Sequence, residues 1–99
     1  MTEKTLAQQQ AEGLRALADM IEQNPELAEE LRYSAMEGVN IPILHNAAST
    51  IAAFARAGVA HNAQIEEHSN EKHAGTYLRW GPVGIHVYAR RELLAKEAS

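Results

Sequence analysis

The sequence predicts a single α+β domain of 99 residues, in which two N-terminal helices precede a β-α-β-β-β portion. Three observations favour this fold class: a helical apolar stripe over residues 3–23, an alanine-rich helical pattern near the middle, and strict alternation in the last third. The helical pair is expected within residues 1–36. The β-α-β-β-β portion is expected over residues 38–99, as a small mixed or antiparallel sheet packed against helices.

The first expected helix spans residues 3–23 and is capped by Thr2 or Thr5. It ends at Asn24-Pro25, because the residue before a proline is pushed out of the α region. Pro25 then begins a second helix that fades over residues 34–38. The apolar stripe of the pair consists of Leu6, Leu14, Leu17, Ala18, Ile21, Leu27 and Leu31. This stripe is expected either to pack on the domain's own sheet or to form a helical dimer interface.

A short strand is expected over residues 39–44, where Val39, Ile41 and Ile43 alternate with polar or proline positions. Pro42 cannot donate a hydrogen bond to a β-ladder, so the strand is expected at a sheet edge. A helix separates it from the next strand, at residues 63–68. A right-handed crossover would therefore set these two strands parallel.

The helix between these strands carries small and apolar side chains on one face. Asn46 or Ser49 is expected to cap it, and Gly58 is expected to close it at the C′ position. The abundance of alanine indicates a close approach to a sheet or to another helix. The face consists of Ala47, Ala48, Ile51, Phe54 and Ala55.

The last third of the chain, residues 63–89, alternates with a period of two and predicts a β-meander. Val83, Ile85 and Val87 must face a core, and the polar segment between the first two strands is expected to be a mobile hairpin tip. The expected elements are strands at residues 63–68, 76–80 and 83–89, a hairpin tip at 69–75, a tight turn at Gly81-Pro82 and a short helical tail at 90–98.

Composition and charge exclude several classes of protein. A hydrophobic fraction of 45% and a charged fraction of 22% argue against disorder, and the absence of cysteine excludes disulfides, zinc fingers and thiol catalysis. The net charge is −4, with eight acidic and three basic residues in the first 37. This balance argues against loose, phosphate-driven binding of nucleic acid. No segment resembles a signal peptide or a membrane span, so a cytoplasmic protein is expected.

The core is expected to be thin, because alanine supplies much of the apolar content and aromatic residues make up only 5% of the chain. Stability would then depend on self-association, and a homodimer is expected.

One face of the predicted sheet collects side chains suited to recognition: Tyr77, Arg79, His86, Tyr88 and Arg90. Aromatic and guanidinium groups on a pleated surface can stack on bases or anchor a protein partner. Three interpretations stay open: an ordinary solvated sheet face, a protein interface that includes self-association, and a nucleic-acid interface. Trp80 has the opposite parity and is expected on the other face, unless a bulge near Gly81 shifts it.

The five histidines are expected to be scattered over the surface. Imidazole binds transition metals well, but the spacing of these residues fits no compact metal motif, and no metal or cofactor is expected. A weak response to pH follows from any histidine-rich surface. The five are His45, His61, His68, His73 and His86.

No catalytic constellation emerges from the sequence. Ser34, Ser49 and Ser69 lack the surroundings of a nucleophile elbow, and no glycine-rich loop opens a helix after a strand. The carboxylates of residues 66–67 beside His68 are expected to be solvated charge on a strand that enters a turn. The chain is therefore expected not to be an enzyme.

The stretch YLRWGPVGIHVYARRE at residues 77–92, the helix at residues 51–58 and the N-terminal pattern LRALADMIEQNPEL resemble a family of short proteins. Actinobacteria and their phages, including mycobacteriophages, encode this family. Its members often carry a cysteine after the terminal Arg-Glu pair, where this chain has Leu93-Leu94, which removes any thiol role. The resemblance implies a small phage accessory protein that binds and redirects a host protein in the host cytoplasm. It supplies no functional residues.

These observations favour a non-enzymatic module that binds a protein partner through the Tyr/Arg/His sheet face. A nucleic-acid-binding regulator that uses the same face is the alternative.

Overall fold

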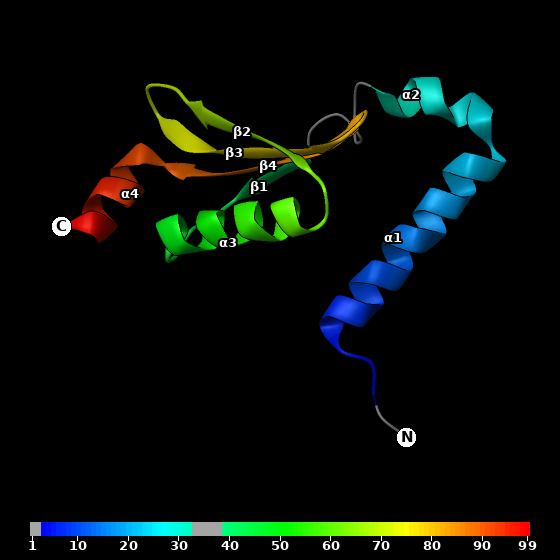
Figure 1. The fold of residues 1–99 in the computed structure, drawn as a ribbon, viewed down its shortest axis with the longest axis horizontal. Coiled ribbons are helices and arrows are strands. Elements are labelled where there is room, and N and C mark those ends of the chain that lie inside the picture. The colour runs from blue at the N-terminus through cyan, green and yellow to red at the C-terminus, as the bar shows by residue number, and fades with distance from the viewer. Residues whose placement is uncertain (1–2, 33–38) are drawn as a thin grey trace. The chain divides into compact units, whose positions relative to one another are not determined.

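The computed structural model describes residues 3–32 and 39–99 and confirms the predicted α+β class. The chain divides into a helical unit, Met1–Leu31, and a second unit, Arg32–Ser99, which contains the sheet (Figure 1). Each unit is described separately below.

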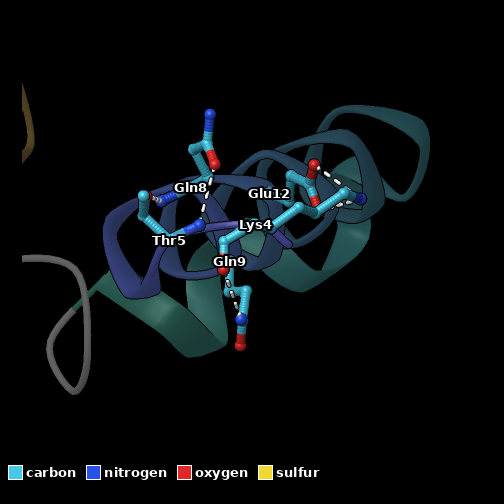
Figure 2. A network of polar contacts seen from close by, with 5 residues as sticks. All are labelled: Lys4, Thr5, Gln8, Gln9 and Glu12. Atoms are coloured by element: carbon cyan, nitrogen blue, oxygen red, sulfur yellow. Dashed lines mark hydrogen bonds and ion pairs between the residues drawn. The ribbon is translucent and has the colours of Figure 1, made fainter. Parts of the chain in front are cut away.

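The helical unit begins with α1 (Leu6–Gln23), which Thr5 caps as predicted. Thr5 Oγ1 accepts a hydrogen bond from the Gln8 backbone N–H at 3.1 Å, and Gln8 Oε1 accepts one from the Thr5 N–H at 2.8 Å (Figure 2). Two backbone donors that a helix terminus leaves unpaired are thereby satisfied. Lys4 Nζ also reaches the carboxylate of Glu12 at 2.9 Å. The alternative cap, Thr2, lies outside the described residues.

The helical unit bends at Asn24, as the Asn-Pro pair predicts. A short 3₁₀ turn, Pro25–Leu27, follows, and α2 (Ala28–Arg32) continues from it. Asn24 does not cap the second segment with its side chain; its Nδ2 donates back to the Met20 carbonyl at 2.9 Å. The expected end of this helix at residues 34–38 lies outside the described residues.

The second unit is built on a four-stranded mixed sheet with the order β1-β4-β3-β2. β1 pairs with β4 in parallel, whereas the β2–β3 and β3–β4 pairs are antiparallel. β1 and β2 therefore run in the same direction, as the crossover predicts, but they lie at opposite edges and do not pair. The edge position predicted for Pro42 is confirmed. The strands are β1 (Val39–Pro42), β2 (Gln64–Ser69), β3 (His73–Trp80) and β4 (Val83–Arg90).

The helix α3 (Ala47–Ala60) lies along one face of the sheet, and α4 (Arg91–Ala98) continues from the end of β4 on the same side (Figure 1). Gly58 is buried where α3 meets the sheet, and a Cβ atom there would lie 2.6 Å from Leu78 Cδ2. The prediction of Gly58 as the C′ residue is therefore wrong: glycine is needed here for close helix–sheet approach. The buried hydrophobic side chains of the described residues are Ala47, Leu78, Val87 and Ala89.

The C-terminal end of α3 is closed by Asn62 rather than by glycine. Asn62 has a φ of 65°, in the left-handed region that asparagine tolerates. The Ala63 N–H donates to the Gly58 carbonyl at 2.8 Å and the Asn62 N–H to the Val59 carbonyl at 3.2 Å. These two bonds form a Schellman motif, which lets the chain reverse directly into β2.

The N-terminal end of α3 is capped from a distant part of the chain. The carboxylate of Glu97 accepts hydrogen bonds from the backbone N–H groups of Asn46 and Ala47, both at 2.8 Å. Asn46 is the N-cap residue, as predicted, but its side chain makes no capping hydrogen bond, and the Ser49 hydroxyl donates to the Asn46 carbonyl. The last helix is thereby tied to the start of α3.

The β2–β3 hairpin has a shorter tip than predicted. Asn70 Oδ1 accepts hydrogen bonds from the N–H groups of Lys72 and His73, at 2.9 and 2.8 Å, so the turn closes quickly. Residues 73–75, predicted to belong to the tip, are instead paired in β3. This shift adds His73 and Gly75 to the sheet.

Candidate functional site

The face of the sheet opposite α3 and α4, called the open face below, carries all five residues predicted for recognition. Tyr77 pairs directly with His86, and paired residues share a face. Their neighbours Leu78 and Trp80 point the other way: Leu78 lies against Gly58 of α3, and Trp80 Nε1 donates to the His61 carbonyl at 2.9 Å. The opposite parity predicted for Trp80 is confirmed.

Three rings of the open face are stacked across two strands. The His86 imidazole lies parallel to the Tyr77 ring, with a centroid distance of 4.2 Å and an interplanar angle of 12°. It also stacks on Tyr88, at 4.8 Å and 22°. His86 is therefore held between two tyrosines, a geometry in which each ring buries apolar area against the next.

Two more histidines and an arginine surround this stack. His68 of β2 meets Tyr77 and His86 edge-on, with centroid distances of 5.5 and 5.1 Å. His73 meets Tyr88 edge-on at 5.2 Å. The Arg79 guanidinium lies 5.3 Å from the centroid of the Tyr77 ring, within the range of a cation–π contact. The ring cluster, as it is called below, consists of His68, His73, Tyr77, His86 and Tyr88.

The prediction of scattered histidines is thus wrong for three of the five. His68, His73 and His86 converge, whereas His45 and His61 lie exposed outside the strands. Alternation along the strands could have placed His68 and His73 on the open face. The predicted hairpin tip at residues 69–75 leaves His73 outside the sheet, so the sequence does not indicate that it joins the other rings.

Gly75 explains how rings from β2 and β4 can meet across β3. Strands separated by one neighbour are about 9–10 Å apart, yet the rings of His68 and His86 come within 5.1 Å. Gly75 lies on β3 between its two partners, His68 and Tyr88, and has no side chain. His86 is two residues from Tyr88 on the same face of β4, so the space left by Gly75 lets its ring approach His68 diagonally. A Cβ atom there would collide with the Val87 carbonyl oxygen and lie 2.6 Å from Tyr88 Cα.

His86 is the most constrained side chain of the ring cluster, with only 9% of its surface exposed. Its Nδ1 lies 3.3 Å from Asn40 Oδ1. An amide oxygen can only accept, so this contact selects the tautomer with the proton on Nδ1. Its Nε2 is buried and has no hydrogen-bond partner within the described part of the chain.

The environment of His86 disfavours its charged form. Burial lowers the pKa of the imidazole below its ordinary value, and the neighbouring His68 and His73 lower it further. The stacked position of His86 therefore favours the neutral form of its imidazole.

The charges on the open face lie around the ring cluster. Arg79 is half-buried against Tyr77, and Arg90 is exposed at the end of the sheet, opposite His73. Glu66 of β2 lies exposed opposite Tyr77. The open face thus presents two guanidinium groups and one carboxylate around the ring cluster.

The other face of the sheet holds an open groove of about 830 Å³ between α3, α4 and the β2–β3 hairpin. It is lined mainly by small apolar side chains such as Ala48, Ala52 and Ala55, with Arg56 and Glu67 among its polar groups. Within residues 3–32 and 39–99, no group of three or more His, Cys, Asp or Glu side chains could hold a metal ion. None of the helices described is long and apolar enough to cross a membrane.

Comparison of the chain with protein-family models, curated proteins and solved structures yields no match. The assignment of a function therefore rests on the open face itself.

Proposed function

We propose that this chain is a non-enzymatic binding module that captures a protein partner through the open face. In this proposal the ring cluster, Arg79 and Arg90 make the contact. In keeping with the resemblance noted above, the chain would act as a phage-encoded accessory protein on a host protein in the host cytoplasm.

The stacking of the rings is the observation that carries this proposal. The rings support one another, so little rotamer entropy remains to be lost when a partner binds. Tyrosine and arginine are also the residue types that most often dominate the energy of protein interfaces. A rigid patch of tyrosine edges and hydroxyls flanked by guanidinium groups suits a protein surface.

The same stacking disfavours the nucleic-acid alternative. A base binds to an aromatic side chain by covering a free ring face. His86 occupies one face of Tyr77, and the Arg79 guanidinium also lies against that ring. Phosphate binding would rely on Arg79 and Arg90 in a chain with a net charge of −4.

The proposal also includes self-association, through a surface other than the open face. The helical unit by itself leaves Leu6 and Leu14 exposed by 69% and 66%. Exposed apolar side chains along one stripe of a helix favour burial against a second copy. A homodimer formed through α1 would use a surface distinct from the open face.

The test is capture of a partner from host-cell lysate by the tagged full-length protein, followed by binding of the purified partner. The expected result is that Arg79→Ala and Tyr88→Ala each abolish capture while the near-ultraviolet circular dichroism of Trp80 stays unchanged. Arg56→Ala is the matched control, because Arg56 is an exposed arginine on α3 outside the open face. Capture that survives both open-face changes would refute the assignment to this face.

A salt titration separates the two kinds of partner. Affinity for nucleic acid falls steeply as salt rises, because bound counterions are released from the phosphates. A contact made mostly by tyrosine rings should change little over the same range. A steep loss of binding, together with recovery of nucleic acid, would favour the alternative.

A further inference from the structure

Three histidines of the open face form one continuous set of ring contacts. His68 touches His86 at 5.1 Å, and Tyr88 joins His86 to His73 at centroid distances of 4.8 and 5.2 Å. Imidazole is the side chain whose charge changes most readily between pH 5 and 8. Protons that bind here place like charges close together.

The structure offers no partner for a second proton on His86. That proton would go to Nε2, which is buried and without an acceptor in the described residues, because Nδ1 already faces Asn40. A buried donor without an acceptor, and a buried charge, are both unfavourable. Protonation of His86 therefore favours an arrangement in which the imidazole leaves the stack and reaches water.

The tyrosines do not cancel this effect. An imidazolium between two aromatic faces gains cation–π attraction, but the Tyr77 ring already has the Arg79 guanidinium 5.3 Å from its centroid. A second cation on the same ring repels the first. The titratable and charged groups around His86 are Glu66 and His68 on β2, His73, Tyr77 and Arg79 on β3, and Tyr88 and Arg90 on β4, with neutral Asn40 on β1. Among them only Glu66 favours the added charge, and it is exposed to solvent.

We infer that the ring cluster is a proton-sensitive device in which protonation of His86 separates the stacked rings and disrupts the binding face. Its consequence for partner capture rests on the proposed function, whereas the rearrangement itself does not. The partner would be held at neutral pH and released on acidification.

The direction of the stability change follows from the lowered pKa of His86. Well above the ordinary imidazole value of about 6.5, both folded and unfolded chains are neutral at this residue, and stability is unaffected by it. As the pH falls below that value, the unfolded chain binds the proton first, so stability decreases. The decrease continues until the pH passes the lowered pKa of the folded chain.

The test is an NMR titration of the histidine ring nitrogens in the full-length protein between pH 8 and pH 4.5. His45 and His61 serve as internal controls, because both are exposed and outside the ring cluster. His86 is expected to titrate at a lower pH than either control, together with a loss of the tyrosine near-ultraviolet circular dichroism. Titration of His86 with the controls, or a tyrosine signal unchanged across the range, would overturn the inference.

Two variants test which histidines cause these effects. His68→Gln should shift the pKa of His86 upward towards that of the controls, whereas His45→Gln should not. His86→Phe keeps an aromatic ring in the stack without a titrating group, so its tyrosine signal should no longer depend on pH. If that variant does not fold, the His68→Gln shift still decides, and an unmoved His86 would count against the inference.

The two proposals fail in different ways. If His86 titrates normally and the partner is still captured, the pH-dependent rearrangement is refuted and the proposed binding face stands. If His86 titrates at a lowered pH but Arg79→Ala and Tyr88→Ala do not affect capture, the proposed binding face is refuted and the pH-dependent rearrangement stands.

Discussion

Gly75 controls how closely the rings of the open face approach one another. The residue lies between His68 and Tyr88 on the neighbouring strands, and a Cβ atom would collide with the Val87 carbonyl oxygen. The backbone of β4 would have to move away from β3 to make room. The contacts of the whole ring cluster thus depend on a residue that has no side chain.

We predict that Gly75→Ala lowers the free energy of unfolding by about 1–3 kcal/mol, the usual cost of overpacking a well-packed site. Chemical denaturation followed by circular dichroism measures this change. Gly13→Ala makes the same substitution in α1, where a Cβ atom meets nothing within 4 Å. That control should raise helix content, since alanine favours a helix interior over glycine by about 1 kcal/mol. Equal stability of the Gly75→Ala variant and the wild type would contradict the predicted collision.

At the scale of elements, the alternation of apolar and polar residues, together with the glycine and proline residues that end strands, is sufficient to predict most of the sheet. The period of two placed Tyr77, His86 and Tyr88 on one face, because each strand is regular there. The pairing of β1 with β4 could not be read in this way. It joins Val39 to Ile85, positions far apart in the sequence, and no local pattern encodes that choice of neighbour.

Helix ends show the same division between local and distant causes. Thr5 and Gln8 are three residues apart, and the capping box they form was half visible in the sequence. The cap on α3 comes from Glu97, 50 residues away from Ala47, so only the fold reveals it. The sequence favours Gly58 over Asn62 as the C′ residue, because glycine is the more common residue at that position.

We predict that Glu97→Ala lowers the free energy of unfolding of the second unit by about 1–2 kcal/mol. The carboxylate accepts two backbone N–H groups at the start of α3, and loss of a helix cap has a cost of this size. Alanine favours helix formation, so α4 itself should not suffer. Glu71→Ala, at the exposed hairpin tip, is the control and should leave thermal stability unchanged. A loss in Glu71→Ala as large as that in Glu97→Ala would show that the general loss of an acidic side chain, and not the cap, is responsible.

For the whole molecule, the distribution of burial separates the two units. Every side chain that is buried among the described residues belongs to the second unit, and α1 has none. The helical unit, Met1–Leu31, carries seven acidic and two basic residues. Its apolar stripe is therefore flanked by negative charge, and this charge shapes how the stripe can associate.

We predict that Leu14→Glu converts a dimer of the full-length chain into a monomer, as measured by sedimentation equilibrium. The change places a carboxylate on the stripe proposed for self-association, where burial of the charge is unfavourable. Ala16→Glu is the matched control: it adds the same charge two residues along α1, away from the stripe, and should leave the dimer in place. Because two helical units of net charge −5 meet in this dimer, added salt should strengthen association by screening their repulsion. A dimer that persists in Leu14→Glu, or one that salt weakens, would contradict association through α1. It would favour association through the second unit, where a dimer would compete with the partner for the open face.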